Sequence, residues 1–342
     1  MPNSELISDF LKHLGNDFPK CSGIGVLVSC SGGPDSMVLL NLLCAVSDKL
    51  DIKPGVVHVN HNLREDSDEE EVFVKSVADE KSVPFLCGRI SGNEWNENRS
   101  DMERRARNLR YDIIAELAEK NGYSIVMTAH HRDDQLETLL MRIFDRGSGL
   151  RGICGILPER TVRGVSFIRP LLPFSKKELK SFLGDKTFIR DPSNENTEIR
   201  RNYFRKEIIP FLEERLSKNI GKHIVSLASA AQNEFSFSNE LADMFWKNFL
   251  EEKSRKTDKI KYVIPRKEIK SHGKRFWMTA FSFLFSKHRG FSHCSTSLED
   301  MALFIKKSEK AKCNYHPFVF SRNAESVVIS TIEPAESGII DL

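Results

Sequence analysis

Residues 24–184 alternate between two hydrophobic patterns. Short apolar runs rich in β-branched residues predict buried strands, and the segments between them repeat apolar residues every three or four positions, which predicts helices. The expected strands lie at 24–28, 55–60, 83–90, 123–129 and 167–172. Strands that alternate with helices are typical of α/β proteins that carry helices on both faces of a sheet. We therefore predict a doubly wound, mainly parallel five-stranded sheet.

The pattern changes in the last third of the chain. A long helical stretch is expected over about 220–250, and the aromatic-rich segment 276–285 predicts the core of a second domain. Residues 316–331 predict a hairpin that turns around Arg322 and Asn323. We therefore expect a large domain over 1–215 and a smaller, mostly helical domain with a terminal hairpin over 216–342.

The first expected strand and the first long helix are joined by the sequence S-G-G-P-D-S. Two glycines permit a turn that other residues disfavour, and proline suits a first helical position. The loop ends at a helix amino terminus, whose N–H groups and dipole favour phosphate. The candidate phosphate-binding residues are Ser31, Gly32, Gly33, Pro34, Asp35 and Ser36. A plain turn is the alternative by glycine content, but the two hydroxyls favour an anion, and Asp35 suits a metal ion or a helix N–H group.

Polar residues also gather where other expected strands end, which is where open α/β sheets bind ligands. His58 and Asn60 close the second strand, and His130 follows the fourth. Asp134 and Glu137 lie one turn apart at the start of the next helix, where carboxylates either compensate the helix dipole or bind a cation or an amine. A group of arginines before the fourth strand forms either a solvated face or a set of phosphate ligands. These are Arg104, Arg105, Arg107 and Arg110.

Composition narrows the class of protein. With 342 residues, 40% of them hydrophobic, the chain can bury one large core and a second, smaller one. No apolar run has the length of a membrane span and the first residues lack a signal-peptide core, so we expect a cytoplasmic protein without membrane contact. Seven cysteines include no C-x-x-C pair, which argues against a disulfide framework or a structural zinc. The net charge of +3 is small, but the basic run 253–275 fits either a phosphate track or a solvated face.

Six motifs follow one another along the first domain. They are S-G-G-P-D-S at 31–36, V-H-V-N-H at 57–61, A-H-H-R-D-D-Q-L-E-T at 129–138, R-G-S-G-L-R-G at 146–152, R-P-L-L at 169–172, and D-P-S-N with R-N-Y-F-R at 191–205. Together they resemble the tRNA(Ile)-lysidine synthetases, a family of PP-loop ATP pyrophosphatases. The resemblance covers roughly residues 22–215. It implies an adenine nucleotide α-hydrolase-like fold, with a PP-loop ATP-binding catalytic domain over 1–215 and a tRNA-binding domain over 216–342.

The resemblance also implies a two-step ligase reaction. ATP adenylates the wobble cytidine of an isoleucine tRNA with a CAU anticodon and releases pyrophosphate, and free L-lysine then attacks carbon 2 of the ring and displaces AMP. The loop 31–36 would bind pyrophosphate with a magnesium ion near Asp35. His58, Asn60 and His130 would bind the nucleotide.

The remaining motif residues would serve the second substrate. Asp134 and Glu137 would hold the lysine amine, because carboxylates can bind an ammonium group and accept its proton. Arg201 and Arg205 would bind either the lysine carboxylate or the activated phosphate.

Other functions fit the sequence less well. Another PP-loop tRNA-modifying ligase, amidating or thiolating, would need a glutaminase partner or sulfur-carrying cysteine pairs, and the sequence contains no such pairs. An ATP-binding sensor of the same fold would have no use for the second anion and amine site. The sequence leaves the oligomeric state open between a monomer and a homodimer.

Overall fold

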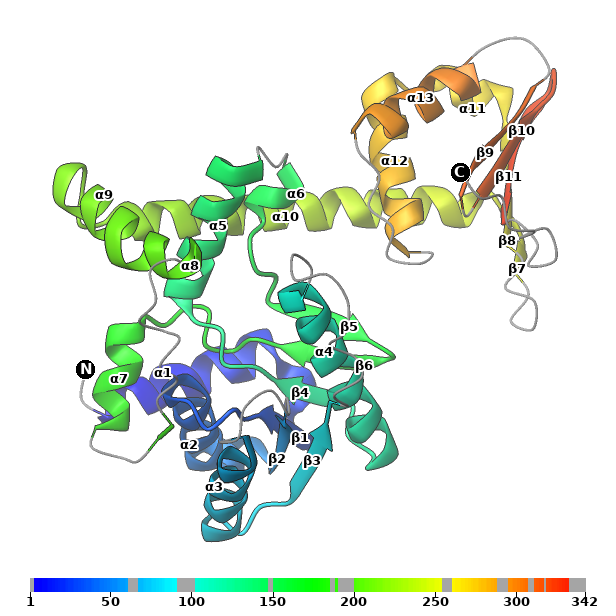
Figure 1. Cartoon of the computed structure of the whole chain (residues 1–342). Helices are drawn as coiled ribbons and strands as arrows, with labels where there is room; N and C mark the ends of the chain where they lie inside the picture. Colours follow the sequence, from blue (N-terminus) through cyan, green and yellow to red (C-terminus); the bar gives the residue numbers. More distant parts are fainter. Residues whose placement is uncertain are drawn as a thin grey trace. The chain divides into compact units, whose positions relative to one another are not determined.

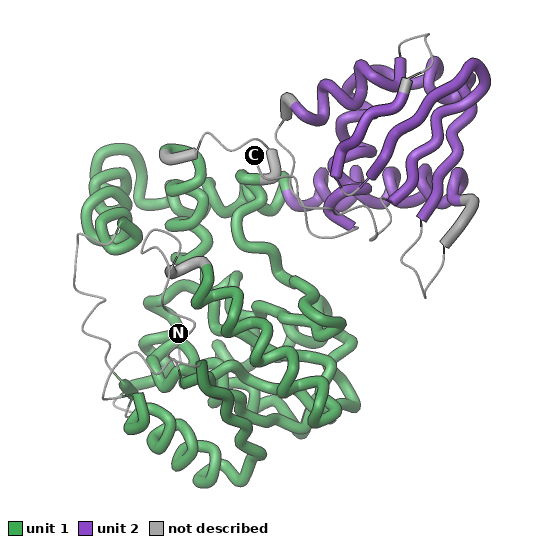
Figure 2. Tube along the Cα trace, turned by 45° about the vertical axis from the view of Figure 1, so that its right-hand side comes forward, with its two compact units in different colours: residues 1–231 green, residues 232–342 purple. Residues whose placement is uncertain are grey.

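The structure is a computed structural model that describes most of the chain. The described residues are 3–60, 67–90, 102–146, 150–184, 188–189, 200–253, 260–287, 295–306, 311–316 and 318–331. Two compact units make up the chain, Met1–Ala231 and Gln232–Leu342 (Figure 2). They divide inside helix α10 (Ile220–Asn248), whereas the sequence pattern predicts a boundary at 215/216. The assignment of one part to catalysis and the other to tRNA binding stays a prediction.

A six-stranded sheet forms the centre of the first unit, in the order β3-β2-β1-β4-β6-β5. Its strands are β1 (Gly25–Ser29), β2 (Lys53–Asn60), β3 (Phe85–Arg89), β4 (Ile125–Met127), β5 (Glu159–Val162) and β6 (Val165–Ile168). Neighbouring strands are parallel except for β5 and β6. This confirms the predicted doubly wound, mainly parallel sheet. The strand order reverses direction at β1, and ligands bind at such a switch point, outside the carboxyl ends of the strands.

Helices cover both faces of this sheet (Figure 1). The helices are α1 (Asn3–Asp17), α2 (Pro34–Leu50), α3 (Ser67–Glu80), α4 (Met102–Lys120) and α7 (Lys176–Leu183). Val26 and Val28 pack in one core with α1, α2, α3 and α7. Leu27 packs in a second core with α4, because successive residues of a strand point to opposite faces. Burial on both faces is why β1 is a continuous apolar run in the sequence.

The prediction of five strands was wrong by one, because it omitted β5. Three of the four residues of β5 are exposed, so this edge strand carries no apolar run that a sequence pattern could detect. A two-residue turn, Arg163–Gly164, joins β5 to β6, and both residues have positive φ angles of 50° and 84°. Such angles are typical of the tight turns that join antiparallel strands.

A helical segment with an irregular turn follows the sheet in sequence. It consists of α8 (Arg200–Tyr203), a π-helical turn η5 (Phe204–Ile208) and α9 (Ile209–Arg215). The sequence predicts that Pro210 kinks or ends this helix, because proline lacks an N–H group. The helix does not end at Pro210, because α9 extends to Arg215. A π turn stands just before the proline, and in it the N–H of Ile209 donates to the carbonyl of Phe204. The wider turn precedes Pro210, and it contains Arg205.

The second unit contains a five-stranded antiparallel sheet in the order β7-β8-β11-β10-β9. Its strands are β7 (Leu250–Lys253), β8 (Ile260–Pro265), β9 (Ala311–Tyr315), β10 (Phe318–Arg322) and β11 (Ser326–Thr331). Its helices are the end of α10, α11 (Arg266–Ser271), α12 (Lys274–Lys287) and α13 (Ser295–Lys306). The predicted hairpin is confirmed as β10 and β11, and Asn323 caps its turn by accepting from the N–H groups of Glu325 and Ser326. The prediction of a mostly helical domain missed β7, β8 and β9.

Aromatic side chains form the core of the second unit. The Trp246 Nε1 donates to the carbonyl of Ala280 at 2.8 Å, and Trp277 and Phe281 are fully buried beside it. The aromatic segment 276–285 therefore packs a core, as predicted. None of the described helices is both long and apolar enough to cross a lipid bilayer.

Candidate functional site

The predicted phosphate loop follows β1 and opens α2. Gly32 has a positive φ of 79°, a conformation that residues with side chains disfavour. Gly33 has an extended backbone with φ −71° and caps the helix, so only the first of the two glycines needs a left-handed conformation. Pro34 occupies the first turn of α2, as predicted. The loop therefore presents a helix amino terminus at the switch point of the sheet.

Hydrogen bonds fix the shape of this loop from inside. The buried Ser36 hydroxyl donates to the Gly33 carbonyl at 2.9 Å and accepts from the Ser31 N–H at 3.3 Å. The Ser31 side chain is exposed. Because the first N–H groups of a helix have no partner within it, the N–H groups of Asp35 and Ser36 could act with the Ser31 hydroxyl as donors to an anion.

Ile189 covers the loop at Gly32. Its N–H donates to the Gly32 carbonyl at 2.9 Å. A Cβ atom at Gly32 would lie 2.4 Å from the Ile189 Cδ1, which is too close for any non-bonded pair of carbons. Glycine is therefore required here both by its backbone angle and by the close approach of Ile189.

The end of β2 supplies two buried polar residues beside the loop. The His58 Nδ1 lies 2.9 Å from the Cys30 carbonyl. The Asn60 amide donates to Asp68 Oδ1 at 3.0 Å and to Glu71 Oε2 at 3.2 Å. Asp68 and Glu71, in the first turns of α3, thus orient Asn60.

His131 lies between the loop and α5 (Arg132–Arg146). Its Nε2 is 3.6 Å from Asp35 Oδ2 and 3.5 Å from Asp134 Oδ2. Burial alone would lower the pKa of His131, but the surrounding carboxylates of Asp35, Asp134 and Asp133 raise it. Burial alone would raise the pKa of Asp35, yet His131 and the charges of Lys176 and Arg205 lower it. The His131 ring and the Asp35 carboxylate therefore face each other at the amino terminus of α2.

One buried histidine atom is left for a ligand. The Nε2 atom of His58 has no hydrogen-bond partner in the part of the chain that the structure describes, whereas the Nε2 atom of His131 faces the carboxylates of Asp35 and Asp134. Buried polar atoms nearly always have such partners in folded proteins. A polar ligand at the carboxyl ends of β1 and β2 would satisfy the His58 atom.

Glu137 and Asp134 are paired with arginines of the segment 200–205. The Glu137 carboxylate has no exposed surface, and it accepts from the Arg201 Nε at 2.7 Å and from the Arg205 Nη2 at 2.9 Å. Asp134 Oδ1 accepts from the Arg201 Nη2 at 2.9 Å. Burial alone would raise the pKa of Glu137, but the two arginines lower it. A substrate amine could reach Glu137 only by displacing an arginine, whereas the Asp134 side chain is 14% exposed.

Asp35 is the residue best suited to a metal ion. No group of three or more histidine, cysteine, aspartate or glutamate residues with metal-binding geometry occurs among the described residues. Magnesium, however, often binds one or two carboxylates together with substrate phosphates and water. The Asp35 side chain, 31% exposed at the amino terminus of α2, fits that mode.

His130 contacts Thr128 and forms no ion pair with the described residues of this group. Its Nδ1 is 3.1 Å from the Thr128 hydroxyl. Burial, together with the charges of Arg169, Arg107, Arg201 and Arg110, holds the pKa of His130 well below its usual value. The histidine is therefore neutral in a basic environment.

The structure thus brings most of the expected residues together at one edge of the sheet. The phosphate loop, His58, Asn60, Asp134, Glu137, Arg201 and Arg205 lie there. Sequence reasoning named His130 as a nucleotide ligand and gave no separate role to His131, which is the residue that joins Asp35 to α5. The consecutive pair at the end of β4 was the available signal, because neighbouring residues point to opposite sides.

Comparisons with known proteins identify the family of the first unit. Residues 4–212 match the model of the PP-loop domain family. The tRNA(Ile)-lysidine synthase of Chlorobaculum tepidum is 38% identical over 218 residues, which cover 62% of this chain and 63% of that protein. The synthase of Streptococcus pyogenes is 39% identical over 189 residues, which cover 55% of this chain and 41% of that protein. The chain thus spans less than two thirds of the length of these curated relatives.

One solved structure supports the fold. The U34-tRNA thiolase NcsA of Methanococcus maripaludis, determined with its iron–sulfur cluster, aligns with a TM-score of 0.54 and 16% identity. The alignment covers 67% of this chain and 77% of the thiolase. At this identity the similarity concerns the fold alone.

Proposed function

The chain belongs to the PP-loop domain family, and from this membership we propose that it is a tRNA(Ile)-lysidine synthase. One observation carries the proposal: His131 joins the phosphate loop at Asp35 to a second charged group, Asp134 with Arg201. A protein that only holds ATP has no need of this second group. The identity to the two synthases supports the same substrates.

The first step would take place at the phosphate loop. The carbonyl oxygen of the wobble cytidine attacks the α-phosphorus of ATP, and the bond to the β-phosphate oxygen breaks as pyrophosphate leaves. The Ser31 hydroxyl and the N–H groups of Asp35 and Ser36 would bind the departing pyrophosphate. His58 and Asn60, fixed by Cys30 and by the acidic residues of α3, would bind the nucleotide.

A magnesium ion would be held by Asp35 together with the phosphates. Bound there, it would neutralise negative charge on the pyrophosphate. His131 beside Asp35 helps to lower the pKa of that carboxyl, which keeps it charged and oriented. The neutral His130 would lie on the arginine side of the nucleotide site.

The second step would use the charged group on α5. The side-chain amine of lysine attacks carbon 2 of the adenylated cytidine, the bond from carbon 2 to oxygen breaks, and AMP leaves with that oxygen. Asp134, the more exposed of the two carboxylates, would bind the amine and accept its proton. Arg201 and Arg205 would bind the lysine carboxylate or the activated phosphate, and Glu137 would position both arginines.

Thiolation is the alternative within PP-loop tRNA enzymes. The cysteines in the part of the chain that the structure describes are Cys21, Cys30, Cys44, Cys87, Cys154 and Cys313, and all are free thiols. No cluster of metal-ligating residues occurs among the described residues. Nothing in the described site favours sulfur transfer over attack by an amine.

A labelling assay tests the function. The protein is incubated with ATP, radiolabelled L-lysine and a transcript of the isoleucine tRNA with the CAU anticodon. We expect one lysine per tRNA, with AMP and pyrophosphate as products. A transcript in which only the wobble cytidine is replaced by uridine is the control and should take up no label. Consumption of ATP without lysine in the CAU transcript would refute the proposal.

A further inference from the structure

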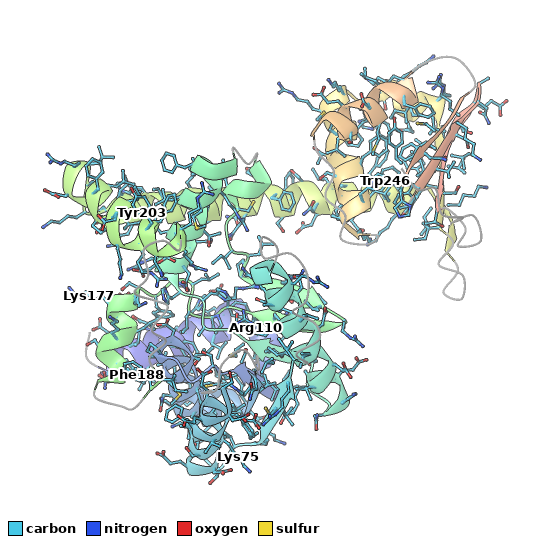
Figure 3. All side chains as sticks on the ribbon, in the orientation of Figure 1. Lys75, Arg110, Lys177, Phe188, Tyr203 and Trp246 are labelled. Atoms are coloured by element: carbon cyan, nitrogen blue, oxygen red, sulfur yellow. The ribbon has the colours of Figure 1, made fainter. Side chains whose placement is uncertain are left out.

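Three arginine side chains surround Tyr111 on α4. The Arg107 and Arg160 Cζ atoms lie 5.9 Å and 5.1 Å from the centre of the Tyr111 ring. The Arg169 Nη2 donates to the Tyr111 hydroxyl at 3.2 Å. Arg110, next to Tyr111 in the sequence and labelled in Figure 3, adds a fourth guanidinium group in the α4 region. We call these four residues, Arg107, Arg110, Arg160 and Arg169, the arginine cluster.

The arginine cluster has no acidic partner among the described residues. No ion pair to a described carboxylate forms at any of its members, although nearly every other charged side chain of the site is paired. Arg169 is 3% exposed and donates to the Leu157 carbonyl at 2.7 Å, but its Nε atom has no described partner. Burial and the charge of Arg107 lower the pKa of Arg110. Like charges gathered in this way repel one another, and a bound anion would remove the repulsion.

The arginine cluster lies on the ligand-binding side of the sheet. Arg169 directly follows β6, and Arg160 lies on β5 near its start, which pairs with the end of β6. Together with burial, the charges of Arg169, Arg107 and Arg110 lower the pKa of His130, which follows β4. The strand order β1-β4-β6 separates this cluster from the phosphate loop by two strand spacings, roughly 10 Å.

We infer that the arginine cluster binds the RNA backbone phosphates on either side of the nucleotide under modification. The inference rests on the proposed function. A base that reacts at the phosphate loop must leave its stack, and its two flanking phosphates must then enter the site with it. Arginine suits this task because its planar guanidinium group binds phosphate oxygens in pairs. The phosphates of ATP are the other phosphates that the arginines could bind, but the loop at residues 31–36 already provides hydrogen-bond donors for ATP.

The test uses the two exposed members of the cluster. Arg107→Gln/Arg160→Gln removes two charges from the carboxyl side of the sheet. Lys120→Gln/Arg163→Gln is the matched control, because it removes two exposed charges from α4 and from the β5–β6 turn at the opposite edge. For both variants, affinity for the CAU transcript is measured against salt concentration, and affinity for ATP is measured separately by equilibrium dialysis.

We expect weaker RNA binding only in the Arg107/Arg160 variant. Its plot of log affinity against log salt should flatten by about 0.7 to 0.9 for each phosphate that the variant no longer binds, while its ATP affinity stays that of the wild type. Equal slopes in the two variants would overturn the inference, and so would a loss of ATP affinity with an unchanged RNA slope.

This outcome is separate from the labelling assay. If the wild type makes lysidine and the salt slope of the Arg107/Arg160 variant does not change, phosphate binding by the arginine cluster is refuted while the function stands. If the slope flattens in a protein that makes no lysidine, the RNA site stands and the function is refuted. The single variants Arg107→Gln and Arg160→Gln should each show about half of the change in slope.

Discussion

Arg205 binds both carboxylate oxygens of Glu137, although 68 residues separate the two in the sequence. The Arg205 Nε donates to Oε1 and its Nη2 donates to Oε2. Two parallel hydrogen bonds of this kind fix the direction of an arginine as well as its position. The π-helical turn η5 contains Arg205, so an irregular helix and a buried carboxylate together set one wall of the site.

Glu137→Gln should destabilise the first unit by about 2 kcal/mol, because Arg205 loses its two-oxygen carboxylate partner and Arg201 keeps only Asp134. The loss should depend on pH. The pKa of Glu137 is lowered in the folded state from its ordinary value of 4.5, so the stabilisation is present above pH 4.5 and disappears as the pH falls through the lower folded value. Urea unfolding of the wild type and of Glu137→Gln measures this loss of stability as a function of pH. Hydrogen exchange of the α5 amides is measured in parallel.

An exposed ion pair provides the control for this prediction. Glu116 pairs with Lys120 on the surface of α4, and Glu116→Gln should change stability little at any pH. In the labelling assay, Glu137→Gln should still adenylate tRNA while it needs more lysine, because the arginines lose their orientation. An unchanged lysine requirement would show that Glu137 does not position them for that substrate.

Asp35→Asn should slow pyrophosphate release about a hundredfold or more, because the amide can neither hold a cation nor supply the negative charge that faces His131. The side chain is 31% exposed, so the fold should tolerate the change. Pyrophosphate release is measured in the presence of tRNA, and the thermal unfolding temperature is measured in parallel. Asp79→Asn, an exposed carboxylate at the end of α3, is the matched control. Near-normal adenylation by Asp35→Asn would show that Asp35 has no role in the adenylation step.

Gly32→Ala should raise the KM for ATP and destabilise the protein. A positive φ costs a residue with a side chain about 1 kcal/mol, and the collision with Ile189 adds about as much again. Gly122→Ala isolates the first effect, since Gly122 has a similar φ of 75° and no described atom within 4 Å of the added Cβ. Adding Ile189→Ala to Gly32→Ala should recover part of the loss in chemical unfolding. If Gly32→Ala and Gly122→Ala behave alike, Ile189 does not constrain the loop.

The sequence predicted the parallel strands well and the polar strands poorly. β1, β2, β4 and β6 are buried on both faces, so each leaves an apolar run. β5 lies at an edge, and its residues Glu159–Val162 are mostly exposed. β7 and β8 flank a run of lysines that resembles a solvated face. The pairing of β8 with β11 joins segments distant in the sequence, which no local pattern contains.

The site residues, like the strands, were predicted where the signal is local in the sequence and missed where it is not. The motifs identified the residues that meet at the carboxyl ends of the strands. They did not show that Glu137 is fully buried against two arginines, because that pairing joins α5 to a segment more than sixty residues later. The placement of His131 between Asp35 and Asp134 also needed the fold, since only the turn after β4 decides which histidine faces the loop.

The second unit gives the last prediction, which concerns the proposed binding of tRNA by the basic run 253–275. Lys256 and Lys259 lie outside the described residues, but Lys267, Lys270 and Arg275 are exposed on α11 and α12. If they bind the tRNA backbone, replacing all three by alanine should weaken binding of every tRNA alike. The slope of log affinity against log salt should flatten by about 2, because each phosphate that is released accounts for about 0.7 to 0.9.

Two comparisons distinguish tRNA binding by Lys267, Lys270 and Arg275 from an effect on the catalytic site. The matched control replaces Lys287, Lys306 and Lys312 of the same unit, which lie outside the run, and should leave the slope unchanged. Arg201→Ala should depress turnover more than affinity, because its proposed partner is a reacting group. Equal slopes for the wild type and the Lys267/Lys270/Arg275 variant would mean that these three residues belong to a solvated face and bind no phosphate.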